Sequence, residues 1–166
     1  DRAPARLLQQ ALVRSWKRKN YAEAINLINK AKELNPTYAE VYKIAAFVKA
    51  NGNDYLGAQE DYEQALQLFP DSPHILYFYG GFRAYHLNDS AGALELVERA
   101  AKADRGNKQI KALHARILTF LGRLDEAWVA FDELINNMTD EPSHFQIKTA
   151  DMAIECLHRM TEQQNE

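Results

Sequence analysis

Histidine and cysteine side chains are the first candidates for chemistry in this sequence, because they bind metals and serve as general bases or nucleophiles. Their spacing does not place two ligands on one face of a helix, and Cys156 and His158 fall on different faces. The Gly80-Gly81 pair lies inside a helical pattern, where it indicates close packing rather than a phosphate-binding loop. No serine stands in a nucleophile-elbow motif. We therefore expect a non-catalytic protein without metal or cofactor. The histidines are His74, His86, His114, His144 and His158.

A basic cluster near the N-terminus is the second candidate. The first twenty residues hold six basic side chains and one acid, whereas the whole chain carries a net charge of −3. Such a helix, with Trp16 as a stacking residue, could bind nucleic acid or an acidic partner. The alternative is the solvated outer face of a terminal helix, or the join to a preceding domain. We favour this alternative, because terminal repeats need a polar outer face. The cluster comprises Arg14, Lys17, Arg18 and Lys19.

Composition predicts an all-α globular domain. Of the 166 residues, 46% are hydrophobic and 26% are charged, and seven Gly and five Pro are few for an all-β protein. No apolar run is long enough to cross a membrane. The single Cys156 cannot form an internal disulfide, so we expect a cytoplasmic location. The chain has no signal peptide and begins at Asp1 rather than Met, so we expect an excised part of a larger protein.

Self-similarity along the chain points to a repeat protein. The stretch from Asn53 to Pro70 reads as a turn, an amphipathic helix and a proline stop, and variants of it occur three more times. Four alanines open these helices at separations of 34, 35 and 34 residues: Ala24, Ala58, Ala93 and Ala127. Four residues after each alanine stands a large apolar residue: Ile28, Tyr62, Val97 and Phe131. Another apolar helix precedes each of them, and its small residue lets the two helices cross closely, at Ala46, Gly80 and Ala115.

This helix-turn-helix pattern resembles the tetratricopeptide repeat. The resemblance is carried by Ala46, Ala58, Tyr62, Ala65 and Pro70 in one unit, and by RLDEA at 123–127 in another. It implies one all-α domain, a right-handed α-solenoid of four such repeats plus a C-terminal capping helix. We place the repeats at about 5–38, 39–72, 73–107 and 108–140, and the capping helix at 143–160. That last helix could instead begin a fifth, truncated repeat. The third unit has one extra residue around 87–89, which predicts a longer turn there.

The resemblance also implies where a partner binds. In this family the first helix of each unit lines a concave groove, and helical phase then selects the residues that face the partner. Phe47, Tyr77 and Tyr85 would be aromatic anchors, and Lys43 and Arg116 would take a carboxylate. The groove set is Lys43, Phe47, Tyr77, Gly81, Tyr85, Ala112 and Arg116, flanked by Gln9, Val13, Lys17, Ala50 and Thr119. The alternative for each residue is packing against a neighbouring helix.

The sequence therefore predicts a scaffold-type module that binds a peptide or helix of another protein. The carboxylate-clamp activity known in this family is disfavoured, because Gln9, Val13, Lys43 and Phe47 occupy the positions that would carry it. Other interpretations are a sensor or oligomerisation arm of a signalling or ATPase protein, and nucleic-acid binding through the basic N-terminal helix. The negative net charge disfavours nucleic acid. Homo-oligomerisation stays open, and we expect no membrane partner.

Overall fold

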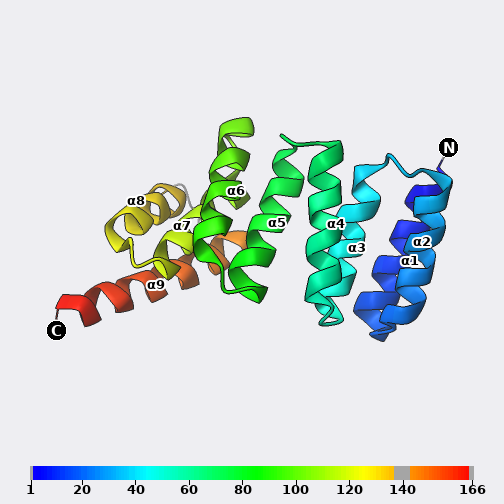
Figure 1. The fold of residues 1–166 in the computed structure, drawn as a ribbon. Coiled ribbons are helices and arrows are strands. Elements are labelled where there is room, and N and C mark those ends of the chain that lie inside the picture. The colour runs from blue at the N-terminus through cyan, green and yellow to red at the C-terminus, as the bar shows by residue number, and fades with distance from the viewer. Residues whose placement is uncertain (1, 137–142, 165–166) are drawn as a thin grey trace.

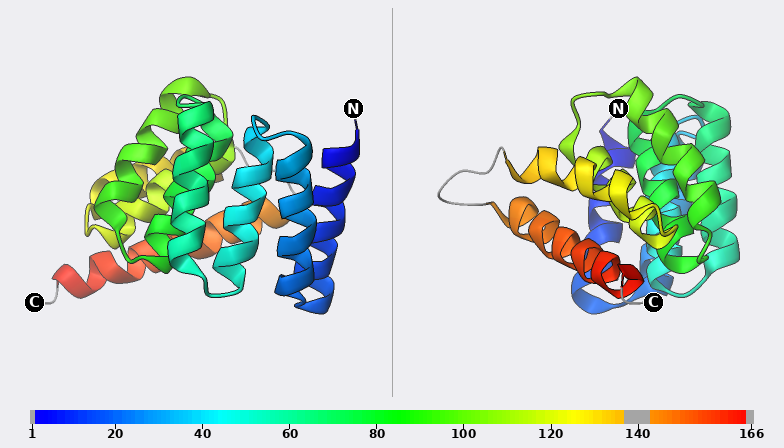
Figure 2. Two further views of the ribbon diagram at one scale, coloured as in Figure 1. Left: turned by 45° about the vertical axis from the view of Figure 1, so that its right-hand side comes forward. Right: turned by 90° about the vertical axis from the view of Figure 1, so that its left-hand side faces the viewer.

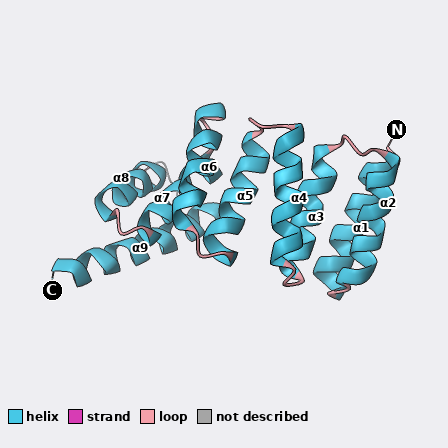
Figure 3. Ribbon diagram, in the orientation of Figure 1, coloured by secondary structure: helices cyan, strands magenta, loops and turns pink. Residues whose placement is uncertain are grey.

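The computed structural model describes residues 2–136 and 143–164, and the regular elements in these ranges are all helices (Figure 1, Figure 3). Within these ranges no helix combines the length and the apolar character needed to cross a membrane. The helices are α1 (Ala3–Arg18), α2 (Tyr21–Leu34), α3 (Ala39–Asn51), α4 (Tyr55–Leu68), α5 (Pro73–His86), α6 (Ser90–Ala103), α7 (Lys108–Phe120), α8 (Leu124–Ile135) and α9 (His144–Gln164).

Side-chain caps define where the second helix of most pairs begins. The side chains of Asn20, Asp54 and Asp89 each accept a hydrogen bond from the backbone N–H three residues later, in the first turn of α2, α4 and α6. Such a cap satisfies an N–H group that has no partner inside the helix. At the other end, Pro36 and Pro70 follow α2 and α4 by two residues and prevent their continuation.

The helices form four consecutive pairs, α1–α2, α3–α4, α5–α6 and α7–α8, which follow one another in an arc (Figure 1). The first helix of each pair also contacts the first helix of the next pair. Helix α9 lies alongside α8 at the C-terminal end, and Figure 2 shows the two packed side by side in its right-hand view. The predicted solenoid of four helix pairs with a further C-terminal helix is confirmed. Helix α9 runs beyond the predicted 143–160, and the predicted repeat end at 140 lies outside the described residues.

The small residues of the repeat lie at the helix crossings. Ala24, Ala58, Ala93 and Ala127 are all fully buried, and so are Ala46 and Ala115 on the facing helices. At Gly80 an added Cβ would lie 2.5 Å from a methyl group of Val97, so only glycine fits this crossing without a shift. The large residues that follow each alanine are buried and belong to successive apolar clusters along the solenoid.

The prediction of a longer turn in the third repeat is wrong. The connections at 52–54, 87–89 and 121–123 have the same length, and the extra residue lies in α5, which has 14 residues where α3 has 13. Turn chemistry explains this outcome. Asn53 and Asn88 adopt positive φ of 66° and 53°, and each precedes an aspartate that caps the next helix. Because this Asn-Asp turn fits only one geometry, the inserted residue extends the helix instead.

Asp61 of α4 joins three helices through a buried ion cluster. Its carboxylate lies 2.5 Å from Nζ of Lys32 in α2 and 2.7 Å from Nζ of Lys49 in α3. Both lysines are about three-quarters buried, and Lys32 also lies over the Tyr42 ring. The cluster fixes the second repeat to the first at a point where the rest of the interface is apolar.

Candidate binding groove

Helix α5 provides the aromatic wall of the main cavity. Its side chains at Tyr77, Phe78, Phe82 and Tyr85 face a cavity of about 530 Å³, and Gly81 between them leaves the space in front of the helix open. An added Cβ at Gly81 would meet Leu113 only at ordinary contact distance, so this glycine, unlike Gly80, is not needed for packing.

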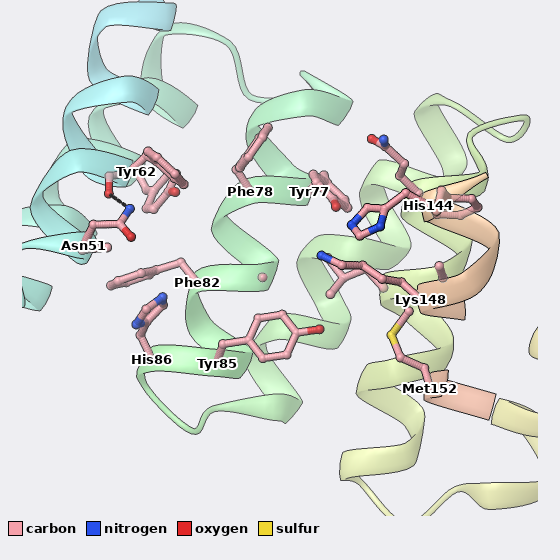
Figure 4. Close-up of a pocket in the computed structure, with 17 residues that line it drawn as sticks. Asn51, Tyr62, Tyr77, Phe78, Phe82, Tyr85, His86, His144, Lys148 and Met152 are labelled. Carbon is pink, nitrogen blue, oxygen red and sulfur yellow. Dashed lines mark hydrogen bonds between the residues drawn. The ribbon is translucent and has the colours of Figure 1, made fainter. Parts of the chain in front are cut away.

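Three further helices and the first residues of α9 complete the cavity. Helix α3 contributes Phe47, Ala50 and Asn51, α4 contributes Tyr62, and α7 contributes Gln109, Ala112 and Leu113. From α9 come His144, Phe145, Lys148 and Met152. Figure 4 shows Lys148 and Met152 on the side opposite Phe82 and Tyr85, with the Lys148 ammonium directed into the space between them. The cavity size is within the range of ligand sites in proteins.

Ring contacts hold the aromatic wall in place. The ring centroids of Tyr62 and Phe82 are 5.4 Å apart, and those of Phe82 and His86 are 5.5 Å apart. Tyr85 meets Phe120 of α7 edge-on at 5.8 Å, and burial raises the pKa of its hydroxyl. Burial also raises the pKa of Tyr77, so both phenols stay neutral hydrogen-bonding groups at physiological pH. The wall is therefore a preformed, uncharged aromatic surface.

Five of the seven groove residues expected from the sequence line this cavity: Phe47, Tyr77, Gly81, Tyr85 and Ala112. The other two, Lys43 and Arg116, do not line it. Among the flanking residues, Ala50 lines the cavity. Thr119 is fully buried and donates a hydrogen bond to the carbonyl of Ala115, so its side chain is packed inside the protein and is not available to a ligand.

Arg116 is held by the C-terminal helix. Its guanidinium pairs with the Glu155 carboxylate of α9 and lies 4.9 Å from the centroid of the Phe120 ring. Arg159 shares the same carboxylate and donates to the carbonyl of Thr119. Because Glu155 and the Phe120 ring already hold its guanidinium, Arg116 ties α9 to α7 and does not extend into the cavity.

Lys43 is also occupied. Its side chain is 7% exposed, its Nζ lies 2.5 Å from the Glu40 carboxylate, and it is 2.9 Å from Nδ1 of His74. A lysine ammonium can only donate, so it binds the unprotonated Nδ1 of His74. Burial lowers the pKa of His74, and the Lys43 charge lowers it further, while Glu40 raises it.

His74 and His114 predict a loss of stability on mild acidification. Burial lowers the pKa of both from the ordinary value of 6.5. The unfolded chain therefore binds protons at a higher pH than the folded chain, and the free energy of unfolding decreases as the pH falls below 6.5. We expect the urea-derived free energy of unfolding to decrease between about pH 7 and about pH 5. In a His74→Gln, His114→Gln variant, the free energy of unfolding should change less over this pH range. An unchanged pH dependence would show that other groups cause the loss of stability.

The contribution of α9 to the cavity is the part that the sequence did not reveal. Phe145, Met152, Ala153 and Cys156 belong to one apolar stripe, which predicts a single buried face for a capping helix. In the structure Ala153 and Cys156 pack against Phe131 of α8, whereas Phe145 and Met152 line the cavity. A signal was present in Lys148, a cation on the same side of the helix as Phe145 and Met152.

The N-terminal cluster borders a second depression, of about 300 Å³, lined by Ser15, Trp16, Lys19, Tyr21, Phe47 and Asn51. Trp16 is 81% exposed, and Arg14 pairs with Glu23 at 3.0 Å. Lys17 is exposed but does not line the depression, and the Arg18 side chain lies outside the described residues. Among the described side chains of the predicted basic patch, Lys19 alone lines this depression.

Among the first candidates for chemistry, His86 and His144 line the cavity, whereas Cys156 lies in the packed interior. Cys156 is fully buried, and burial raises the pKa of its thiol, which opposes formation of the reactive thiolate. Over the described ranges, no three His, Cys, Asp or Glu side chains are grouped so that they could hold a metal ion.

Comparisons with known proteins agree with this architecture. No known family model matches the chain. The chain is 26% identical over 129 residues to protein FlbA of Caulobacter vibrioides, a match that covers 76% of this chain and 22% of FlbA. The chain thus spans about a fifth of the length of that curated relative.

Two solved structures show the fold. PilF of Pseudomonas aeruginosa superposes with a TM-score of 0.79 at 20% identity, covering 96% of this chain and 70% of PilF. YrrB, described as a tetratricopeptide-repeat protein with an unusual peptide-binding site, has a TM-score of 0.62 at 20% identity, covering 95% of this chain and 90% of YrrB. Similarity at this level of identity establishes a shared fold.

Proposed function

The chain has the tetratricopeptide-repeat fold, and from this premise we propose that it is a non-catalytic module whose groove binds a peptide or helix of another protein. The observation that carries the proposal is the cavity of about 530 Å³. Aromatic side chains of α5 form one of its walls and are held by rings of neighbouring helices, and the start of α9 forms the opposite wall. Rigid aromatic side chains in a concave site contribute much binding energy, because little conformational entropy is lost when they are covered.

The comparisons support this class of function. YrrB is described as having a peptide-binding site and shares the fold over nearly its whole length. The groove of this chain presents apolar rings together with a few polar groups, which is the pattern of sites that recognise peptides or amphipathic helices. We also propose that the module serves a longer cytoplasmic protein, for which the partial coverage of FlbA is the supporting observation.

Replacement of two groove tyrosines tests the proposal. Peptides of about twenty residues, selected on the wild-type protein from a randomised display library, would be titrated against a Tyr77→Ala, Tyr85→Ala variant. We expect affinity to fall by about 100-fold, because each truncation removes a large ring from the cavity wall. The affinities would be measured by fluorescence anisotropy with labelled peptides.

A matched double variant controls for general effects of removing aromatic rings. Tyr38 and Phe69 are exposed and line neither depression, so Tyr38→Ala with Phe69→Ala should leave affinity unchanged. Both double variants should retain the wild-type circular dichroism spectrum. If the Tyr77, Tyr85 variant stays folded and binds the selected peptides with unchanged affinity, the groove is not the binding site.

A further inference from the structure

The two depressions join into one groove along the first helices of the repeats. Phe47 and Asn51 of α3 line both the cavity in front of α5 and the depression beside Trp16. We call the combined surface, from Lys19 to Met152, the extended groove. It passes from the end of α1, across α3, α5 and α7, to the start of α9.

The charged side chains that line the extended groove are basic. Among the described residues that line it, none is Asp or Glu, and the two lysines stand at its two ends. Lys19 lies beside Trp16 at the N-terminal end, and Lys148 lies between Phe145 and Met152 at the C-terminal end. Both lysines are exposed, and neither forms an ion pair with a described residue.

Ion pairing separates these two lysines from Lys43 and Arg116, the cations that the sequence selected for the groove. Lys43 pairs with Glu40 and Arg116 pairs with Glu155, and neither lines the groove. Lys19 and Lys148 keep their charge available at the surface. Between the lysines, the groove presents mainly aromatic rings and the small residues Ala50, Gly81 and Ala112, with the imidazoles of His86 and His144 among them. A ligand that matches this surface has apolar side chains in its middle and anionic groups near both ends.

The length of the match follows from helix packing. The four first helices contact one another in sequence, and packed helices lie about 8–10 Å apart, so the groove spans about 25–30 Å. A chain in extended conformation covers about 3.3 Å per residue, which corresponds to about eight residues along this span. A helical ligand rises about 1.5 Å per residue and would need about 18 residues for the same span.

We propose that the extended groove binds a protein segment with large apolar side chains flanked on both sides by Asp or Glu, whose carboxylates meet Lys19 and Lys148. This inference rests on the proposed function, since it names the partner's chemistry for the same groove. Carboxylates at the ends remain partly hydrated beside an exposed ammonium, whereas a carboxylate over the central rings would lose more of its hydration and would meet no ammonium group there. A segment flanked by lysines would be repelled at both ends.

The amino-acid content of the selected peptides gives the first test. The wild-type protein would be presented with a randomised display library of peptides about twenty residues long. We expect the bound peptides to be enriched in aromatic or large aliphatic residues with Asp or Glu on both sides. Apolar enrichment without an acidic preference would overturn the inference and leave the proposed function intact. Selected peptides that bind the Tyr77→Ala, Tyr85→Ala variant as well as wild type would overturn both.

Charge reversal at the groove ends gives the second test, with a variant of equal net charge as its control. Lys19→Glu with Lys148→Glu should weaken binding of an acid-flanked peptide by about 10-fold or more at low salt. Lys30→Glu with Lys102→Glu changes net charge by the same amount at exposed positions on α2 and α6 that line neither depression, and it should leave affinity nearly unchanged. Equal losses in the two variants would mean that only overall charge matters, and the inference would fail.

Peptide synthesis separates the contribution of the flanks from that of the apolar residues. In the best binder, Asn and Gln would replace all Asp and Glu, so that shape is kept and charge is removed. This neutral peptide should bind the wild type more weakly and should not distinguish the wild type from the Lys19→Glu, Lys148→Glu variant. A short oligothymidylate would serve as a competitor. Its displacement of the peptide at physiological salt would overturn the inference in favour of nucleic-acid binding through Trp16 and Lys19.

Discussion

Replacing Ala58 by Trp is expected to lower the free energy of unfolding by at least about 4 kcal/mol and to melt the helices around it, because the side chain has no space at the crossing of α3 and α4. Ala58 is fully buried, and the facing Ala46 is fully buried too. The two helices would have to separate to admit an indole, which would also expose Tyr62 and the adjoining core. Far-UV circular dichroism during urea titration measures the loss.

The control for this prediction lies two residues away on the same helix. Leu56 is 80% exposed, so Leu56→Trp introduces the same side chain into α4 without overpacking. We expect its free energy of unfolding to stay within about 0.5 kcal/mol of wild type. An Ala58→Trp variant with a normal unfolding curve would show that α3 and α4 do not cross at this residue.

Much of the fold could be predicted from the sequence, because the residue type at each repeat position reflects a steric requirement between two neighbouring helices. A small residue is required wherever two helices approach closely, and the fully buried Ala24, Ala58, Ala93 and Ala127 all meet this requirement. The helix ends follow from similarly local chemistry. Capping side chains and prolines act within a few residues, and α2 accordingly begins after the Asn20 cap and ends before Pro36.

The fate of individual charges could not be predicted, because it depends on residues far away in the sequence. Arg116 pairs with Glu155, a residue 39 positions later on α9. Helical phase places Arg116 on the first helix of its repeat, but it carries no information about which carboxylate comes near when the last helix packs. Lys43 has one partner of each kind: Glu40 lies three residues earlier on the same helix, whereas His74 belongs to the next repeat and comes near only in the folded chain.

The groove itself was predictable on one side only. Phe47, Tyr77 and Tyr85 lie on helices whose phase is fixed by the repeat, so their direction could be inferred. The opposite wall comes from α9, which has no counterpart in the other repeats and whose position depends on contacts with α8. The positions that recur in every repeat therefore define the solenoid. The aromatic and charged side chains of this groove come in part from α9, which does not recur.

Removal of the Asp61 carboxylate is expected to destabilise the N-terminal half of the solenoid by about 3 kcal/mol. Asp61 is buried in α4 and joined to Lys32 and Lys49, so Asp61→Ala leaves two largely buried ammonium groups facing each other without a counter-ion. The lysines can reach water only by giving up packing, which includes the contact of Lys32 with the Tyr42 ring. Urea titration followed by circular dichroism measures the change.

Two further variants distinguish loss of the buried pair from loss of an aspartate in general. The Asp71 side chain is 91% exposed and lies 3.6 Å from Arg99, so Asp71→Ala should cost less than about 0.5 kcal/mol. Replacing the whole cluster, with Asp61→Leu, Lys32→Met and Lys49→Met, should recover most of the stability, because it leaves no buried charge and fills a similar volume. If Asp61→Ala unfolds at the same urea concentration as wild type, the lysines are hydrated in solution and the cluster does not hold the first two repeats together. If the triple variant stays as unstable as Asp61→Ala, the carboxylate acts through its shape and hydrogen bonds rather than by balancing the two charges.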